Sequence, residues 1–267
     1  MEKKGLLLGQ GNTAEIYEWE TDKILKLYRN GLPEILCNNE FNATKSVYNL
    51  LHATPKPFEI VHVDSRVGAV YERITGKTML KEMVSKPWKF GKYSNMLAQC
   101  HVNIQKPIDF KLPTVKEKLK RDIDGTPLLS DTEKQRIYQY MDSLPDGSML
   151  CHFDFHPDNI MLSNGNYIII DWMTACKGDR LSDVARTGII LNFSEIQRVP
   201  RLANFILSRL KKKVYNDYLK EYLKITNVSV KEIKRWEMPI AAARLREWIP
   251  EKEQQKLLIF VRENLSN

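Results

Sequence analysis

The chain has 267 residues, of which 43% are hydrophobic, and it contains 12 glycines and 12 prolines and carries a formal net charge of +8. This composition is ordinary for a globular protein with one large core or two lobes, and the sequence shows no repeats, low-complexity tracts or disordered linker. No apolar run approaches a membrane span, and Leu6–Leu8 is too short for a signal-peptide core, so we expect a cytoplasmic protein without a membrane partner.

The first predicted element is a strand, a glycine-containing turn and a second strand over residues 6–19. Small residues at Gly9, Gly11 and Ala14 would allow backbone N–H groups to approach phosphates closely. Two glycines before an alternating run are equally typical of a plain hairpin. The segment alone therefore leaves both interpretations open.

A short strand is predicted over Lys23–Tyr28, and Lys26 lies in it between apolar neighbours. Such a lysine either extends along a sheet edge or points into a cleft at an anion. Its place after the glycine hairpin favours the cleft. Lys23 is the competing candidate, but it begins the strand beside Asp22, in the context of a turn.

A helix is predicted from about Pro33 through Leu51, since proline suits a first turn and apolar residues follow at roughly helical spacing. Glu40 on this helix is the candidate partner for Lys26, which it would hold against the phosphates of a nucleotide. The alternative is a solvated helix glutamate. Glu34 is less suitable, because the helix dipole already explains a carboxylate in the first turn.

Residues 68–76 are predicted to form a buried strand that runs into a turn. The segment Glu72, Arg73 and Ile74 is the candidate hinge, whose backbone groups would hydrogen-bond the edge of an adenine ring. We place the boundary between two lobes near Gly76. Residues 1–76 would form the nucleotide-binding lobe, and residues 77–267 the lobe with the catalytic loop, the metal site and the acceptor-binding helices.

The most informative stretch is residues 151–160, which contain His152, Asp154 and Asn159, followed by an apolar strand that ends at Asp171. Kinase-type enzymes use this arrangement to place a base and two metal ligands around the terminal phosphate of a nucleotide. Asp154 would accept a hydroxyl proton, and Asn159 and Asp171 would offer oxygen ligands to Mg²⁺. The alternative is that these are ordinary turn residues, but that does not explain a carboxylate at the end of an apolar strand.

A tight hairpin is predicted at Asn164 and Gly165, with residues 160–162 and 167–170 paired as antiparallel strands. Such a hairpin would return Asp171 to the loop that holds Asp154 and Asn159.

Mostly helical segments follow the first lobe, and Pro239 is expected to kink or interrupt one of them. Helices at the carboxyl end are the natural place for acceptor recognition, although their aromatic residues are equally compatible with core packing. The predicted helices cover about residues 93–105, 114–123, 132–144, 201–225, 230–248 and 251–264.

Other reactive side chains are expected to be structural. Cysteines without metal-type spacing predict free thiols, and His101 and His156 have no second ligand spaced around them. The cysteines are Cys37, Cys100, Cys151 and Cys176.

The chain resembles the aminoglycoside phosphotransferase and choline kinase group of small-molecule kinases over nearly its whole length. His152, Asp154, Asn159 and Asp171 carry the resemblance, together with the helix end at residues 97–101 and the segments 178–187 and 241–245. The resemblance implies a two-lobed α/β protein-kinase-like fold, with a small antiparallel-sheet lobe and a larger helical lobe. It implies transfer of the γ-phosphoryl group of ATP, with Mg²⁺, to a hydroxyl of a small molecule.

The chain departs from the protein-kinase pattern at three positions, one of which is Ala14 at the third small position of the glycine-containing turn. Phe153 stands where protein kinases usually have arginine, and Met173 where they usually have glycine, which favours a small-molecule acceptor. The resemblance also implies that Asp183 accepts hydrogen bonds from the catalytic-loop backbone, although it could instead cap the following helix. A structural role is expected for Asp179 as well. GTP in place of ATP and the oligomeric state stay open.

Charge supplies the competing hypotheses. Residues 195–267 hold 16 Lys and Arg against 9 Asp and Glu. A nucleic-acid-associated basic module is therefore one alternative, with Lys211–Lys213 as the candidate patch. A nucleotide-binding regulatory module without catalysis is a separate alternative, but the residues expected for the chemistry are all present. Interleaved acidic residues favour a solvated face, so nucleic acid is not the expected partner. The same surplus favours a neutral or anionic acceptor, unless Glu237, Glu247, Glu251 and Glu253 gather into an acidic patch.

Overall fold

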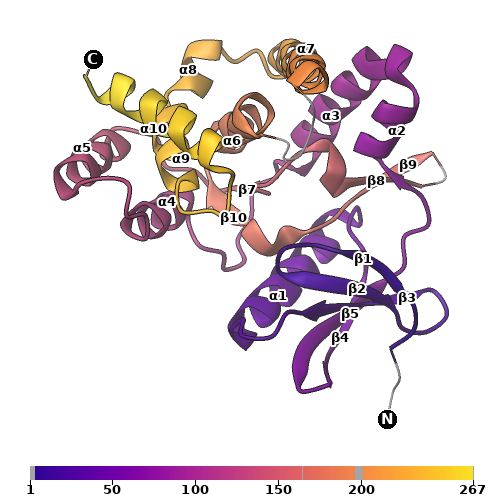
Figure 1. Cartoon of the computed structure of the whole chain (residues 1–267). Coiled ribbons are helices and arrows are strands. Elements are labelled where there is room, and N and C mark those ends of the chain that lie inside the picture. Colours follow the sequence, from indigo (N-terminus) through magenta and orange to yellow (C-terminus); the bar gives the residue numbers. More distant parts are fainter. Residues whose placement is uncertain (1–3, 164, 196–200, 267) are drawn as a thin grey trace. The chain divides into compact units, whose positions relative to one another are not determined.

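The computed structural model describes residues 4–163, 165–195 and 201–266, except for the side chains of residues 201–206. The chain divides into two compact units, one comprising Met1–Val84 with Pro157–Thr174 and the other Ser85–His156 with Ala175–Asn267 (Figure 1). Between Val84 and Pro157, and again after Thr174, the chain therefore leaves the first unit for the second.

The first unit is built on an antiparallel sheet whose strands lie in the order β1-β2-β3-β5-β4. The hairpin predicted over residues 6–19 is present, with Gly9 opposite Ile16. The strand predicted over Lys23–Tyr28 is also present and is paired with strands on both sides. The strands are β1 (Leu7–Gln10), β2 (Ala14–Glu18), β3 (Lys23–Tyr28), β4 (Pro57–Val63) and β5 (Arg66–Glu72).

Alternation along β3 decides which side chains meet the neighbouring helix, because successive residues of a strand face opposite sides. Leu25 and Leu27 are buried with Val70 on one face of the sheet. Tyr28 is buried on the other face, in a cluster that includes residues of α1 (Glu34–Leu51). Lys26 shares the face of Tyr28, and the strand period therefore points it toward α1.

The predicted helix after Pro33 is confirmed as α1, with Pro33 in the N-cap position and extended backbone angles. His52 ends the helix in the left-handed conformation, with φ of 50°. Cys37, Phe41 and Val47 are buried along the length of the helix. This apolar stripe supplies the helix side of the first unit's core.

A smaller antiparallel sheet in the order β6-β8-β9 completes the first unit. It joins β6 (Lys77–Thr78) to the predicted hairpin, formed by β8 (Ile160–Ser163) and β9 (Asn166–Ile169). Gly165 has a φ of +80°, as a tight turn requires, whereas Asn164 lies outside the described residues. This pairing draws residues 157–174 into the first unit, so the observed division differs from the boundary at residue 76.

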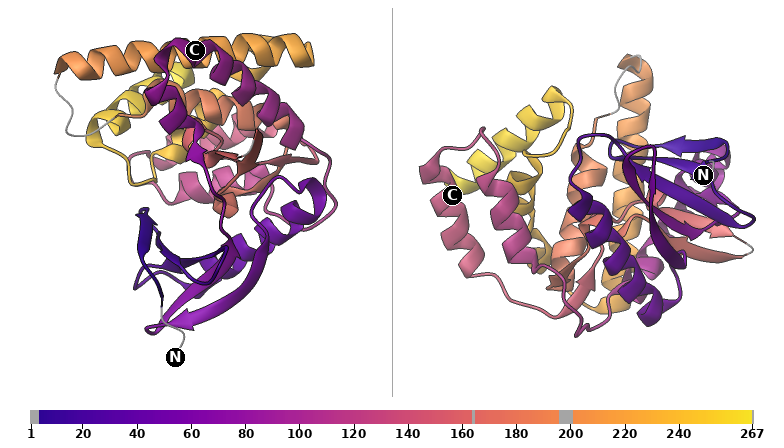
Figure 2. Two further views of the ribbon diagram at one scale, coloured as in Figure 1. Left: turned by 90° about the vertical axis from the view of Figure 1, so that its right-hand side faces the viewer. Right: turned by 90° about the horizontal axis from the view of Figure 1, so that it is seen from below.

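The second unit is mainly helical. In it, α7 packs along α3, and α9 contacts α4, α6 and α10. Figure 2 (left) shows α7 from the side, as the long orange helix at the top. A short antiparallel pair of strands, β7 (Met149–Cys151) and β10 (Cys176–Gly178), flanks residues 152–175, the segment that contains Asp154. The helices are α3 (Phe90–Ile104), α4 (Val115–Asp124), α5 (Asp131–Asp142), α6 (Arg180–Phe193), α7 (Arg201–Thr226), α8 (Val230–Lys234), α9 (Glu237–Arg244) and α10 (Glu251–Ser266).

Two helical expectations need correction. The segment 230–248 forms two helices, α8 and α9, and the break falls at Arg235 and Trp236 and not at Pro239. The helix α2 (Met79–Ser85) was not predicted. Each of the four cysteines is a buried free thiol, as expected. Among the described residues, no helix combines the length and apolar character needed to cross a membrane.

Candidate functional site

Lys26 is the centre of a charged cluster in the first unit. Its Nζ lies 2.6 Å from Oε1 of Glu40 and 3.0 Å from Oδ1 of Asp171. Burial alone would lower the pKa of Lys26, but the carboxylates of Asp171 and Glu40 outweigh it and raise this pKa above its usual value. The structure thus brings together three candidates from β3, α1 and the segment after β9, and it keeps the lysine charged.

Tyr28 contributes a fourth member, which the sequence analysis missed. Its hydroxyl donates a hydrogen bond to Oε2 of Glu40, whose other oxygen accepts from Lys26. Glu40 is buried, so both oxygens of its carboxylate are held by donors. The available signal was the two-residue spacing of Lys26 and Tyr28, which puts both on the same face of β3.

Asn159 and Asp171 are tied together by the backbone of the β8–β9 segment. The amide of Ile170 donates a hydrogen bond to the carbonyl of Asn159 over 3.0 Å. Asp171 is the next residue after Ile170, so this bond keeps Asp171 near Asn159. Asp171 has a left-handed φ of 66°, and its side chain is 39% exposed. A carboxylate and an amide oxygen are ligands that suit Mg²⁺ bound to phosphates, so the donor set fits the expected ion.

The turn that contains Gly9 and Gly11 has open space around both glycines. A Cβ on Gly9 would meet no atom of the described residues within 4 Å, and one on Gly11 would meet only the Ala14 carbonyl at 3.8 Å. Arg29 donates from its side chain to the carbonyl of Gly11. Packing within the described residues therefore does not require glycine at either position.

The predicted hinge has two of its amides already engaged. The Glu72 N–H donates to the carbonyl of Lys56 over 2.9 Å, and the Arg73 N–H donates to that of Asp22 over 2.8 Å. The Arg73 side chain pairs with Glu18. These bonds fix the end of β5. A ligand at this segment would therefore have to hydrogen-bond to the remaining backbone groups of Glu72, Arg73 and Ile74.

The second unit carries Asp154, on the loop after β7. Its side chain is 31% exposed; Oδ2 lies 3.4 Å from Nε2 of His156, and Oδ1 lies 4.0 Å from an Nη atom of Arg186. Burial alone would raise the pKa of Asp154, but the hydrogen bond and charge of His156 and the charge of Arg186 hold it well below its usual range. Asp154 is therefore a carboxylate at all pH values near neutral.

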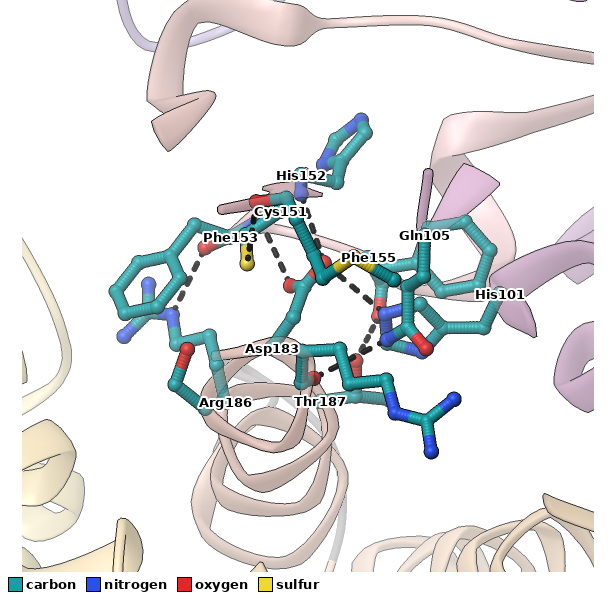
Figure 3. Close-up of polar contacts among 12 residues, drawn as sticks. His101, Gln105, Cys151, His152, Phe153, Phe155, Asp183, Arg186 and Thr187 are labelled. Carbon is teal, nitrogen blue, oxygen red and sulfur yellow. Dashed lines mark hydrogen bonds and ion pairs between the residues drawn. The ribbon is translucent and has the colours of Figure 1, made fainter. Parts of the chain in front are cut away.

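Three side chains of α6 hold the backbone of the loop that carries Asp154 (Figure 3). Asp183 accepts the amides of His152 and Phe153 over 2.7 and 2.8 Å. Arg186 donates to the carbonyl of Phe153, and Thr187 donates to that of Phe155. Phe153 has a left-handed φ of 64°, and this set of bonds stabilises that conformation.

Asp183 is in turn fixed by α3 and α7. Nε2 of His101 lies 3.0 Å from Asp183, and Nδ1 of the same ring lies 2.6 Å from the hydroxyl of Tyr218. Burial would raise the pKa of Asp183, but the charge and hydrogen bond of His101 hold it below its usual value. Of the two roles considered for Asp183, the structure shows the backbone contact. Asp179 caps α6 by accepting the Leu181 amide.

The four glutamates considered as an acidic patch are mostly engaged. Glu247 and Glu253 pair with Arg244, and Glu247 also pairs with Arg186. Glu251 accepts the side-chain amide of Gln255. Burial raises the pKa of Glu237 despite the charge of Lys234.

A family model described as the phosphotransferase enzyme family matches residues 4–209, which include every candidate site residue. The chain belongs to this family. The match covers the first unit and the loop that carries Asp154. A comparison with curated proteins found no match.

Solved structures of kinases share the fold of this family member. Choline kinase LicA from Streptococcus pneumoniae is 15% identical, with a TM-score of 0.63, over 97% of this chain and 92% of that one. An aminoglycoside-3'-phosphotransferase of type VIII is 14% identical, with a TM-score of 0.62, over 89% and 92%. The streptomycin–ATP–APH(2")-IIa ternary complex is 14% identical, with a TM-score of 0.53, over 98% and 91%. The fold is therefore the two-lobed kinase-like fold expected from the sequence.

Proposed function

We propose that this phosphotransferase moves the γ-phosphoryl group of ATP, in the presence of Mg²⁺, to a hydroxyl group of a small molecule. The observation that carries the proposal is the partly buried Lys26 held between Glu40 and Asp171 at 2.6 and 3.0 Å. A charged lysine fixed in this way has the chemistry needed to neutralise phosphate oxygens. Family membership supports the reaction class, and a solved structure of similar fold contains ATP.

Nucleotide binding is assigned to the first unit. Lys26 would pair with phosphate oxygens, and Glu40 would orient it because Glu40 is itself fixed by Tyr28. The backbone around Gly9 and Gly11 would line the phosphates, where the absence of side chains permits a close approach. The adenine edge would be read by the carbonyls of Glu72 and Arg73 and by the backbone of Ile74.

The metal is assigned to Asn159 and Asp171. Bound there, Mg²⁺ would neutralise charge on the phosphates of the nucleotide. Asp171 would then share its carboxylate between the metal and Lys26, which it already contacts. Asn159 adds a neutral oxygen, so the pair contributes one negative charge to the site.

The base is assigned to Asp154. Its lowered pKa keeps it ionised, so it can orient the acceptor hydroxyl and take the hydroxyl proton as the new oxygen–phosphorus bond forms and the bond to the nucleotide breaks. A weak base suits a loose transition state, in which the proton leaves late. The bonds from Asp183, Arg186 and Thr187 fix the loop and hence the direction of this carboxylate.

The acceptor is proposed to be neutral or anionic. Glu247 and Glu253 are paired with arginines, so they offer little negative charge to a polycation. The alternative of a nucleic-acid-associated module has less support, because Lys211 donates to Ser194 and Lys213 pairs with Asp217. A nucleotide-binding regulatory module would bind ATP without turnover.

The test is a coupled nucleotide-turnover assay over a panel of hydroxyl compounds, run on the parent and on Asp154→Asn. We expect the parent protein to turn over ATP faster when one of the hydroxyl compounds is present. The variant should lose at least about 10²-fold in kcat, because its base is removed, and should keep nucleotide affinity. Comparable turnover in both proteins would remove Asp154 from the mechanism, and nucleotide binding without turnover on any compound would favour the regulatory module.

A further inference from the structure

Arg186 lies between two carboxylates at unequal distances. Its side chain is 6% exposed, one Nη atom lies 2.7 Å from Oε1 of Glu247, and the same nitrogen lies 4.0 Å from Oδ1 of Asp154. Its Nε donates to the carbonyl of Phe153, the residue before Asp154 (Figure 3). The guanidinium therefore makes its close ion pair with Glu247 and stays beyond hydrogen-bond distance of Asp154.

Glu247 is held in place from its other side. Its Oε2 lies 2.7 Å from Arg244, and Arg244 donates through Nε and Nη2 to the buried Glu253 at 2.8 and 2.7 Å. Glu253 also accepts the backbone amide of Glu195 over 3.0 Å. Positive and negative groups thus alternate from α6 to the start of α10, and Glu247 has an arginine on each side.

We propose that Glu247 is a positioning residue for Asp154, which it serves by holding Arg186 away from the catalytic carboxylate. This inference rests on the proposed role of Asp154 as the base. A buried guanidinium needs a carboxylate partner, because an unpaired charge in the interior is costly. Without Glu247, the nearest carboxylate is that of Asp154, and an arginine fork pairs with both oxygens of a carboxylate at once.

The consequence would be local to the acceptor side of the reaction. Asp154 capped by Arg186 would be a weaker base and would present less of its carboxylate to the acceptor hydroxyl. Nucleotide binding is assigned to Lys26 and Asp171 in the other unit, so it should be unaffected. Glu247→Gln keeps the size of the side chain, and Arg186 keeps its bond to Phe153 and gains Asp154 as its ion-pair partner, so the variant should fold.

The variant is Glu247→Gln, and the matched control is Glu251→Gln, which removes a nearby exposed glutamate bonded to Gln255 and to neither arginine. The hydroxyl compound selected by the panel serves as acceptor, with water as acceptor if no compound exceeds it. We expect Glu247→Gln to lower kcat about 10-fold, with the KM for ATP changed less than about 2-fold. The control should match the parent in both constants.

A double-mutant cycle with Arg186→Gln tests whether Glu247 acts through the arginine. In the Arg186→Gln background, Glu247→Gln should cause no further loss of kcat, because there is no guanidinium left to restrain. Additive losses would overturn the proposal. If Arg186→Gln does not fold, Glu247→Asp replaces it: the retained charge should restore most of the lost kcat, and a loss as large as that of Glu247→Gln would count against the proposal.

A crystal structure of Glu247→Gln gives a readout that needs no activity. The contact between Arg186 and Asp154 should shorten from 4.0 Å to an ordinary ion pair, and an unchanged distance would overturn the inference. Asp154→Asn in the same assay separates the two failures. Turnover that survives Asp154→Asn contradicts the proposed function, whereas loss in that variant together with parent-like Glu247→Gln contradicts only the role of Glu247.

Discussion

At the scale of single residues, Lys26 shows how a strand period and two charges define a site. Alternation along β3 turns its side chain toward α1, and the carboxylates of Glu40 and Asp171 then fix the ammonium group. Tyr28 uses the same period to reach Glu40. The pairing of Lys26 with Glu40 was predicted from the sequence, since both elements could be located, but the hydroxyl of Tyr28 was not, because its partner depends on tertiary packing.

The first prediction concerns Asp171. Replacing Asp171 by Asn removes the charged oxygen proposed for the metal, so Mg²⁺ should strengthen nucleotide binding less in the variant than in the parent. Calorimetric titration of ATP with and without Mg²⁺ measures this directly. Asp64→Asn removes a carboxylate of the same unit that pairs with Lys4, and it should behave as the parent. Equal Mg²⁺ enhancement in Asp171→Asn and the parent would exclude Asp171 as a ligand.

The second prediction uses the open space at Gly9. A Cβ there meets no described atom within 4 Å, so Gly9→Ala should leave the thermal midpoint unchanged or slightly raised. A bound phosphate close to the backbone would meet that Cβ, so nucleotide affinity should fall about 10-fold. Gly91→Ala, in α3, is the matched control, because its Cβ would have only Asp217 nearby, at 3.9 Å. Unchanged affinity in Gly9→Ala would assign the turn to a plain hairpin.

At the scale of elements, the β8–β9 hairpin shows how pairing between distant strands changes which residues belong to the first unit. Local signals predicted the hairpin itself, whereas its pairing with β6 joins residues 77 and 162, which are far apart in sequence. Gly76 permits that approach, because a Cβ on it would lie 2.1 Å from the carbonyl oxygen of Leu162. This glycine marks a close contact between strands, which sequence alone could not distinguish from a loop boundary.

The break between α8 and α9 also lies at a tertiary contact. Trp236 is buried, and its indole donates to Asp179, whose other oxygen caps α6. Arg235 and Trp236 form the turn between α8 and α9, so the break coincides with this long-range contact. Pro239 falls in the first turn of α9, where its missing N–H has no intrahelical partner to lose. The expected proline interruption was therefore wrong in position.

The third prediction concerns the link between α5 and α10. Glu133 accepts from the Arg262 side chain over 2.7 Å and from the Ser130 amide, and these bonds lower its pKa from 4.5 to about 2. A lowered folded-state pKa means that the stabilisation is present above pH 4.5 and is lost as the pH falls toward 2. Glu133→Gln should therefore cost roughly 0.5–1 kcal/mol of unfolding free energy at pH 6.5, and clearly less at pH 3.5.

Urea unfolding of the parent and Glu133→Gln at both pH values measures that difference. Arg262→Gln removes the other partner and should show the same decline toward low pH. A cost that is equal at pH 6.5 and 3.5 would show that Glu133 acts through packing and not through its charge.

At the scale of the whole molecule, the residues proposed for catalysis were easier to recognise in the sequence than the groups that hold their loop. His152, Asp154, Asn159 and Asp171 lie in one compact motif, so their spacing could be interpreted directly. Arg186, His101 and Tyr218 lie 32 residues or more from Asp154, and nothing in their local patterns marks them as contacts of that loop. Their roles became visible only when α3, α6 and α7 were seen to pack together.

The last prediction concerns the acceptor. It follows from the surplus of basic residues in the carboxyl-terminal segment and from the pairing of its glutamates. The carboxyl-terminal segment holds 16 basic and 9 acidic residues, and two of those acidic residues, Glu247 and Glu253, are already paired with arginines. A polycation would meet repulsion at such a surface, which slows encounter and weakens binding. We expect kcat/KM for a neutral hydroxyl compound to exceed that for kanamycin-type aminoglycosides by about 10-fold or more. Steady-state kinetics on both classes at one ionic strength measures the ratio, and efficient aminoglycoside phosphorylation would show that carboxylates other than these set the specificity.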